Sequence, residues 1–137
     1  MKTTVFPGDF SSLDEIRTFF TAAGKEAGLD QQTLYDIQLA ADEAASNIID
    51  HAYGGEGIGK IECSYRILND RLEIFLKDFG RPFNPESIEQ PDLEIDPCDR
   101  PPSGLGLYFM RQLMDEVVYY FNGDGGNVLK MVKIAEK

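Results

Sequence analysis

The stretch RLEIFLKDFG, residues 71–80, decides the fold of this 137-residue chain. Its polar and apolar residues alternate, and side chains of one parity lie on one face of a β-strand. Asp78 therefore shares a face with three apolar side chains, Leu72, Ile74 and Leu76. Burying even a neutral polar group without a partner costs about 2–7 kcal/mol. We expect Asp78 to accept a hydrogen bond from a ligand that carries an amino group.

A second alternating segment precedes this strand. Residues 58–68 carry apolar side chains on one face and polar side chains on the other. The expected inward residues are Ile61, Cys63, Tyr65 and Ile67. Asn69-Asp70 is typical of a tight turn, so the two segments are predicted to pair as a β-hairpin.

Two helices are predicted before the hairpin, after a short first strand over residues 2–6. Ser12 and Glu15 have the spacing of a capping box, and Gly28 suits the left-handed end of the first helix. Asp30 is the expected cap of the second helix. The expected inward residues of the first helix are Leu13, Ile16, Phe20, Ala23 and Ala27, and those of the second are Leu34, Ile37, Ala41, Ala44, Ile48 and Ala52. Gly54-Gly55-Glu56-Gly57 is expected to stop the second helix.

The C-terminal half begins with a different composition. Residues 81–103 are rich in proline and acidic residues and predict a lid-like loop. A helix over residues 106–114 and a buried strand over 117–121 should follow. The last strand, residues 128–134, carries Lys130 and Lys133, which suit an edge or an exposed face.

The order β-α-α-β-β-loop-α-β-β predicts an α+β fold. We expect a two-layer α/β sandwich, with a mostly antiparallel sheet and the helices on one face. The sequence shows no internal repeat, and residues 1–137 fit one domain.

The overall charge excludes some partners. The chain has 13 Lys and Arg against 24 Asp and Glu, a formal charge of −11, which opposes docking on nucleic acid or an anionic membrane. Cys63 and Cys98 fit neither a metal motif nor a disulfide framework, and reduced thiols are expected. No segment resembles a leader or a membrane span, so a cytoplasmic protein is expected.

Two polar side chains lie one turn apart on the second predicted helix. Glu43 and Asn47 project from the same face, at the margin of the buried stripe that contains Ala44 and Ile48. An amide oxygen and a carboxylate at such a position can hold magnesium or position an attacking hydroxyl. Alone, the pair is more typical of a solvated helix face.

The glycines of Ser103-Gly104-Leu105-Gly106-Leu107 open the third predicted helix. Backbone N–H groups at a helix start can approach phosphates when no side chain obstructs them. A lone Gly-x-Gly is more often a hinge, and Gly80 alone is more often a turn residue. Their order along the chain, with Glu43, Asn47 and Asp78, favours a nucleotide site.

The ordered motifs resemble the GHKL nucleotide-binding family of gyrase-type ATPases and histidine kinases. Glu43 to Asn47 matches its N box, Asp78 to Gly80 its first glycine box, and Gly104 to Leu107 its second. Within that family, the chain most resembles bacterial serine kinases that act as anti-sigma factors. The finer match rests on Asp42-Glu43-Ala44, Asn47, His51-Ala52-Tyr53 and Gly104-Leu105-Gly106-Leu107-Tyr108, which leads into Leu113-Met114-Asp115-Glu116.

The resemblance implies a role for each motif. Asp78 would accept a hydrogen bond from the adenine amino group of ATP, and Gly80 would let the base approach. Asn47 would ligate Mg²⁺, Glu43 would be the general base, and the backbone of Gly104, Leu105 and Gly106 would contact the phosphates.

Two features depart from the pattern. Pro102 stands where the fuller second glycine box has a glycine, and no lysine lies near the boxes. The nearest cations are Arg81, Arg100 and Arg111, and none matches a motif. His51, the only histidine, is expected to be a helix-end side chain rather than a phosphoacceptor.

The leading hypothesis is an ATP-dependent protein serine/threonine kinase. By resemblance, it would phosphorylate a STAS-type anti-anti-sigma protein, sequester a sigma factor and form a possible homodimer. One alternative is a nucleotide-binding regulatory module that binds a partner without phosphorylating it. Another is an interaction domain without nucleotide. Arg17, on the first predicted helix, is a possible partner contact, although a solvated charge is the simpler interpretation.

Overall fold

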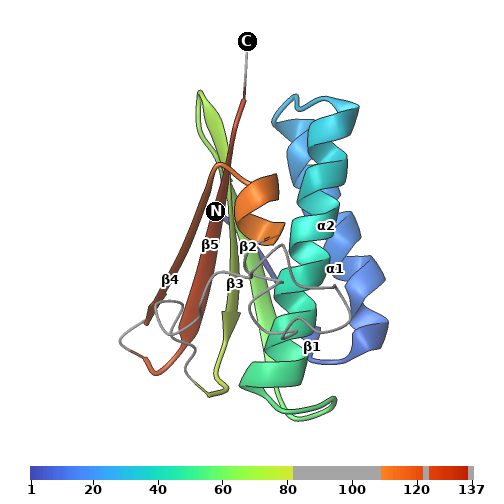
Figure 1. Cartoon of the computed structure of the whole chain (residues 1–137), viewed down its shortest axis with the longest axis vertical. Coiled ribbons are helices and arrows are strands. Elements are labelled where there is room, and N and C mark those ends of the chain that lie inside the picture. The colour runs from blue at the N-terminus through green and yellow to red at the C-terminus, as the bar shows by residue number, and fades with distance from the viewer. Residues whose placement is uncertain (82–108, 122–123, 136–137) are drawn as a thin grey trace, which may run out of the picture.

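A computed structural model gives the arrangement of residues 1–81, 109–121 and 124–135 (Figure 1). Strands, helices and turns follow in the order β1 (Lys2–Pro7), a 3₁₀ turn (Phe10–Ser12), α1 (Leu13–Glu26), α2 (Gln31–Asn47), a π-helical turn η2 (Ile48–Ala52), β2 (Lys60–Ile67), β3 (Arg71–Asp78), β4 (Glu116–Phe121) and β5 (Asn127–Ile134). Residues 109–113 are also helical. The lid-like loop expected over 81–103 lies, apart from Arg81, outside the described residues.

The five strands form one antiparallel sheet in the order β1-β2-β3-β5-β4. Helices α1 and α2 cover one face of this sheet, and the short helical segment 109–113 lies on the same side (Figure 1). The predicted α+β sandwich, with helices on one face of a mostly antiparallel sheet, is confirmed.

The core lies between the helices and the inner face of the sheet. The alternating row of β3 faces inward as predicted, because Leu72, Ile74 and Leu76 are fully buried. The apolar stripe of α2 packs against it and is wider than expected, since Ala40, Ala45 and Ile49 are buried too. Asp78 ends the β3 row with only 5% of its surface exposed.

The helix ends confirm two predictions and correct one. The Asp30 carboxylate accepts a hydrogen bond of 2.9 Å from the Thr33 backbone N–H, and Gly28 adopts a left-handed φ of +80°. The Ser12 side chain forms no cap bond. A capping serine needs an extended backbone, whereas the 3₁₀ turn holds Ser12 at φ −83° and ψ −11°.

The C-terminal strands correct the sequence prediction. β5 lies inside the sheet, paired with β3 and β4, and β4 is the edge strand. The apolar run of β4 was expected to be buried, but Val118, Tyr120 and Phe121 are exposed. An apolar run marks a strand but does not say which neighbours cover it.

Both lysines of β5 are satisfied inside the sheet rather than at an edge. Lys130 lies 3.2 Å from Glu73 on the outer face, and Lys133 donates a hydrogen bond of 2.6 Å to the Leu113 carbonyl on the inner side. Their long apolar stems allow the charged ends to reach these acceptors.

Ile67 is 37% exposed, contrary to the expected inward position. The Tyr65 hydroxyl donates a hydrogen bond to Glu26, the last residue of α1. The helix therefore ends level with Tyr65, and Ile67 extends beyond its cover. The other three predicted inward residues of β2, Ile61, Cys63 and Tyr65, are buried.

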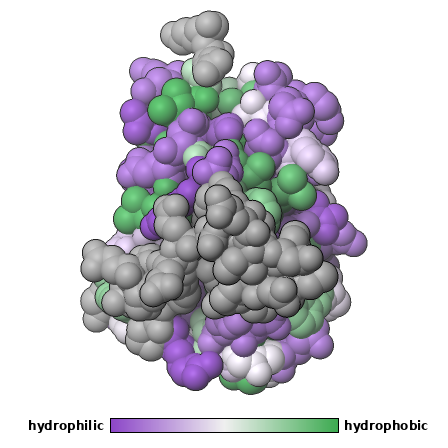
Figure 2. Space-filling view, viewed as in Figure 1, coloured by the Kyte–Doolittle hydropathy of each residue, from purple (hydrophilic) through white to green (hydrophobic). Residues whose placement is uncertain are grey.

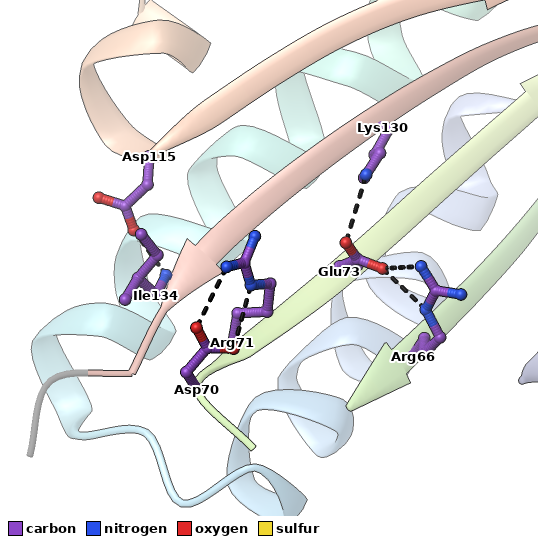
Figure 3. Close-up of polar contacts among 7 residues, drawn as sticks. All are labelled: Arg66, Asp70, Arg71, Glu73, Asp115, Lys130 and Ile134. Carbon is purple, nitrogen blue, oxygen red and sulfur yellow. Dashed lines mark hydrogen bonds and ion pairs between the residues drawn. The ribbon is translucent and has the colours of Figure 1, made fainter. Parts of the chain in front are cut away.

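A buried carboxylate lies on the outer face of the sheet (Figure 3). Glu73 accepts hydrogen bonds from Arg66 and also pairs with Lys130, from the two strands that flank β3. Burial alone would raise the pKa of Glu73, but the hydrogen bonds and charges of Arg66 and Lys130 lower it overall. The ionised form is therefore favoured in the folded state.

Replacing Glu73 with glutamine should destabilise the protein by about 1–2 kcal/mol at neutral pH, because Arg66 is half exposed and keeps part of its hydration. Since the folded pKa is lowered, the wild-type contribution is present above the ordinary value of 4.5 and is lost as pH falls through the folded value. Urea unfolding from pH 7 to pH 3 measures this. The difference between variant and wild type should shrink on acidification, and a constant difference would contradict the ion-pair account.

Candidate functional site

The Asp78 carboxylate, at the end of β3, is held by hydrogen bonds on one side only. Its Oδ1 accepts from the Gly80 backbone N–H at 2.9 Å and from the Asn127 Nδ2 at 3.0 Å. Within the described part of the chain, both hydrogen bonds to this carboxylate end on Oδ1. Oδ2 is therefore available to accept a hydrogen bond from the amino group of a ligand.

The environment of Asp78 disfavours its charge. Burial raises its pKa, while the hydrogen bonds from Asn127 and Gly80 act in the opposite direction without cancelling the shift. A ligand donor on Oδ2 would add a hydrogen bond to the ionised form. The site is thus suited to gain stability when an amino group arrives.

Gly80 packs against the end of the helical segment that follows α2. A Cβ at this position would clash with the carbonyl oxygen of Ala52, and the Arg81 N–H donates to the same oxygen at 2.7 Å. The sequence resemblance assigned Gly80 to approach of the base. The structure gives a further reason for a glycine here. Gly80 lies directly against the backbone of Ala52, which leaves no room for a side chain.

Replacing Gly80 with alanine should lower the free energy of unfolding by about 2–3 kcal/mol, because the added methyl meets rigid backbone rather than a flexible side chain. Urea denaturation measures the loss. The double variant Gly80→Ala/Ala52→Gly removes the Ala52 methyl and should not restore stability, since the clash is with the carbonyl. Full restoration would show that the methyl, not the backbone, is the obstacle.

Tyr53 fixes the same turn from the other side, a role that the sequence did not predict. Its hydroxyl accepts a hydrogen bond of 3.1 Å from the Phe79 N–H and donates one of 2.5 Å to the Lys60 carbonyl. Gly59 leaves room for the ring, because a Cβ there would clash with it. The turn after Asp78 is therefore held by both Ala52 and Tyr53.

Glu43 and Asn47 lie on α2, which leads into this contact. Both are partly buried, beside the buried Ala44 and Ile48, as the predicted margin position requires. Asn47 precedes Ala52 by five residues, about 7 Å along a helix axis. The strand end docks at Ala52, so α2 brings Asn47 to the same end of the molecule as Asp78. The π-helical turn lies between them, and such turns are frequent at functional sites.

The side chain of Asn47 forms no hydrogen bond in the described residues, so its amide oxygen is free for a metal ion or its waters. Glu43 has no hydrogen-bond partner there either. The neighbouring Asp42 instead accepts a hydrogen bond of 3.1 Å from Arg17 of α1, which also pairs with Asp14. This bond ties the N-terminal helix to the helix that carries the candidate base.

The remaining candidate residues divide into two groups. Gly104, Leu105, Gly106, Pro102 and Arg100 lie outside the described residues. Arg111 is exposed on the helical segment 109–113, and Arg81 donates a hydrogen bond of 3.2 Å to the His51 carbonyl. His51 itself is exposed in the π-helical turn, which agrees with its predicted helix-end position.

A cavity of about 580 Å³ lies next to the strand end but does not contain the Asp78 carboxylate. It is lined by Gly80 and Arg81 and, on the outer side of the sheet, by residues that include Val5, Glu62 and Phe79. Asp78 faces the inner side, toward the helices. Ala52 and Tyr53 also line this cavity, which therefore lies beyond the end of β3, and Asp78 is not among its lining residues.

Other chemistries find no support in the described residues. Cys63 is fully buried, which raises the pKa of its thiol to about 12, and Cys98 lies outside these ranges. Groups of three or more His, Cys, Asp or Glu side chains placed to bind a metal are absent from the part of the chain that the structure describes. In that part, the helices are too short or too polar to cross a membrane.

Figure 2 shows that polar residues predominate in the coloured part of the viewed face, with apolar residues scattered among them. This distribution agrees with the net charge of −11.

Asn127 is the other site residue that the sequence did not predict. It lies directly opposite Asp78 in the β3–β5 register, 49 positions away in sequence. The only signal was a polar residue at the start of the apolar last strand, which is also typical of a turn.

Comparison with known proteins places this geometry in a family. Residues 6–133 match the model of the histidine kinase-like ATPase domain. The serine-protein kinase RsbW of Listeria monocytogenes is 33% identical over 128 residues, covering 88% of this chain and 79% of that protein. The protein of the same name from Halalkalibacterium halodurans is 32% identical over 126 residues, covering 89% of this chain and 75% of that protein.

Solved structures agree at the level of the fold. The catalytic domain of the histidine kinase ThkA aligns over 98% of both chains with a TM-score of 0.58 and 17% identity. A histidine kinase domain from Erythrobacter litoralis aligns over 93% of this chain and 61% of that one, with a TM-score of 0.55 and 18% identity. The match over residues 6–133, the RsbW relatives and the sandwich fold show that this chain belongs to the GHKL family of histidine kinase-like ATPase domains.

Proposed function

We propose that this chain is a single-domain anti-sigma factor and ATP-dependent protein serine/threonine kinase. It phosphorylates a serine of a STAS-type anti-anti-sigma protein and sequesters a sigma factor in the cytoplasm. The observation that carries the proposal is the buried Asp78 carboxylate, which keeps Oδ2 free for an amino donor in a chain that belongs to an ATPase family. The relatives named serine-protein kinase supply the reaction class.

The described residues fit ATP at the base end. Asp78 Oδ2 accepts a hydrogen bond from the adenine amino group, and Gly80 keeps the strand end close enough to Ala52 to hold that carboxylate in place. Asn47 would hold Mg²⁺ through its free amide oxygen, and the bound ion would supply positive charge to the phosphate site. The backbone N–H groups of Gly104, Leu105 and Gly106 complete the phosphate site in this proposal.

Glu43 acts as the general base. Its carboxylate takes the proton from the serine hydroxyl of the partner as that oxygen forms a bond to the γ-phosphorus. The bond between the γ-phosphorus and the bridging oxygen breaks, and ADP leaves with the electron pair. Such catalysis depends mainly on positioning and on charge stabilisation.

The partner surfaces follow from the exposed residues. Arg17 of α1 is partly exposed and pairs with Asp14 of the same helix and with Asp42 of α2, so a protein that docks on α1 contacts a side chain linked to the helix of Glu43. Homodimerisation through the outer face of the sheet is supported by Val5, Val118 and Tyr120, three exposed apolar side chains on that face.

A second candidate is a nucleotide-binding module that captures a partner without phosphorylating it. Glu43 separates the two, because its carboxylate is needed as a base but not for capture. The test is a pull-down from the source cell with the full chain, with and without ATP and Mg²⁺, sorted for sigma factors and STAS proteins. Recovery of both with nucleotide supports partner capture, which the two candidates share, and recovery of neither would contradict both. Label transfer from γ-labelled ATP that depends on Glu43 then separates the kinase from the binding module.

A further inference from the structure

Asn127 forms a hydrogen bond with Asp78, the carboxylate that is proposed to bind the base. It is 7% exposed and directly opposite Asp78 in the antiparallel register, so the two side chains share the inner face of the sheet. Its Nδ2 donates to Asp78 Oδ1 at 3.0 Å and to the Gly80 carbonyl at 3.0 Å, with the Arg81 carbonyl at 3.4 Å. One amide therefore holds the carboxylate and the turn that follows it.

The orientation of this amide is determined by its surroundings. All three neighbours of Nδ2 are acceptors, so a rotated amide would place Oδ1 of Asn127 against three oxygens. An amide nitrogen has two hydrogens to donate, and the Asp78 and Gly80 bonds use both. Asn127 consequently has no donor left for a ligand.

The Asp78–Asn127 pair therefore offers acceptors alone at the base site. Asp78 Oδ1 is occupied by Asn127 and by the Gly80 N–H, which leaves Oδ2 as the acceptor for an incoming group. An adenine amino group satisfies such an acceptor. The carbonyl oxygen that guanine and hypoxanthine carry at the same ring position would instead meet a carboxylate oxygen with no hydrogen between them.

We propose that Asn127 is the positioning residue that makes this site select adenine over 6-oxopurines. It acts through Asp78, by holding the carboxylate in one orientation and by withholding its own donors from the ligand. This inference rests on the proposed nucleotide site and adds its base specificity. A site built to pair a substrate group rejects the analogue that lacks it much more strongly than an apolar pocket does.

The test compares ATP with inosine triphosphate, which differs from ATP in carrying the ring carbonyl instead of the amino group. Calorimetric titration of the full chain with Mg²⁺ should give the wild type an ATP preference of at least about 100-fold. Asn127→Ala should weaken ATP binding about tenfold and change inosine triphosphate binding by no more than about twofold. The ratio of the two affinities should therefore fall about tenfold.

The conservative variant Asn127→Ser provides rescue, because its hydroxyl can donate to Asp78 but not to Gly80 as well. It should recover part of the lost ATP preference. Asn69→Ala, in the exposed hairpin turn at the other end of β3, is the matched control and should leave both affinities unchanged. If the alanine variant unfolds, the affinity ratio is measured on the serine variant instead.

The pH dependence supplies a readout that a merely structural role would not move. Among the described residues, Tyr53 and Tyr119 are the titratable groups that interact with Asp78, and their own raised pKa values keep them neutral near pH 7. The Asn127 hydrogen bond lowers the pKa of Asp78. Without this hydrogen bond the pKa of Asp78 should be higher. On acidification, the Asn127→Ala variant should therefore lose ATP binding at a higher pH than the wild type does.

The outcomes separate the two claims. A wild type that does not bind ATP would overturn the nucleotide site and this inference with it. A wild type that binds ATP, combined with an Asn127→Ala variant whose affinity ratio is unchanged, would overturn the specificity role alone. Equal weakening of both nucleotides would likewise show that Asn127 only supports the fold.

Discussion

Replacing Asp78 with asparagine is expected to abolish measurable ATP binding and leave the fold intact. The asparagine Oδ1 can still accept from Gly80 and Asn127, but the open position then carries an NH₂ group instead of an acceptor. An adenine amino group would face another donor. The rise in melting temperature that ATP and Mg²⁺ cause in the wild type should disappear, with affinity reduced at least about 100-fold.

Without nucleotide, the Asp78→Asn variant should be at least as stable as the wild type. Burial raises the pKa of Asp78 above its ordinary value of 3.8, so the folded state binds a proton more tightly than the unfolded state does. The wild type therefore loses stability as pH rises from that value through the folded pKa, and the neutral amide removes this cost. Thermal unfolding at pH 7 measures it.

Asp70→Asn is the matched control, because this exposed aspartate lies at the opposite end of β3, in the hairpin turn, and pairs with the partly buried Arg71. It should retain the full ATP-induced shift. An Asp78→Asn variant that is stabilised by ATP as much as the wild type would remove Asp78 from the base site.

Replacing Glu43 with glutamine should reduce phosphoryl transfer by about 100-fold to 10,000-fold and leave ATP affinity within about twofold. The amide keeps the size and polarity of the side chain but cannot take the serine proton. The rate is measured as label transfer from γ-labelled ATP to the partner, and the affinity by calorimetry.

Glu116→Gln serves as the control for this variant, since Glu116 is exposed on the edge strand β4 and faces away from the helices. Its transfer rate should equal that of the wild type. Undiminished transfer by Glu43→Gln would defeat the general-base role, whereas equal loss of transfer and of ATP affinity would reassign Glu43 to binding.

Much of the fold was predictable because local patterns decide it. The alternation of β3, the stripe of α2 and the caps at Gly28 and Asp30 each depend on residues a few positions apart. The position of β4 was not predictable, because an apolar run looks the same at an edge as in the middle of a sheet. Strand order depends on pairings that the local pattern does not contain.

The same distinction applies to the candidate site, where local features were predictable from the sequence and contacts between distant segments were not. Glu43, Asn47, Asp78 and Gly80 were predicted from spacing and resemblance, and the structure brings the helix and the strand end together at Ala52. Asn127 and Tyr53 were missed because their contacts join segments 49 and 26 residues apart. The contact of Gly80 with the Ala52 carbonyl was hidden for the same reason.

The most direct test of the central claim is the transfer of label from γ-labelled ATP to the serine of a STAS partner recovered from the source cell. The account predicts that the wild-type chain with Mg²⁺ transfers one phosphoryl group per partner, and that a partner with alanine in place of that serine receives none. Nucleotide binding and partner capture without any transfer would contradict it, and would leave the chain as a nucleotide-dependent binding module.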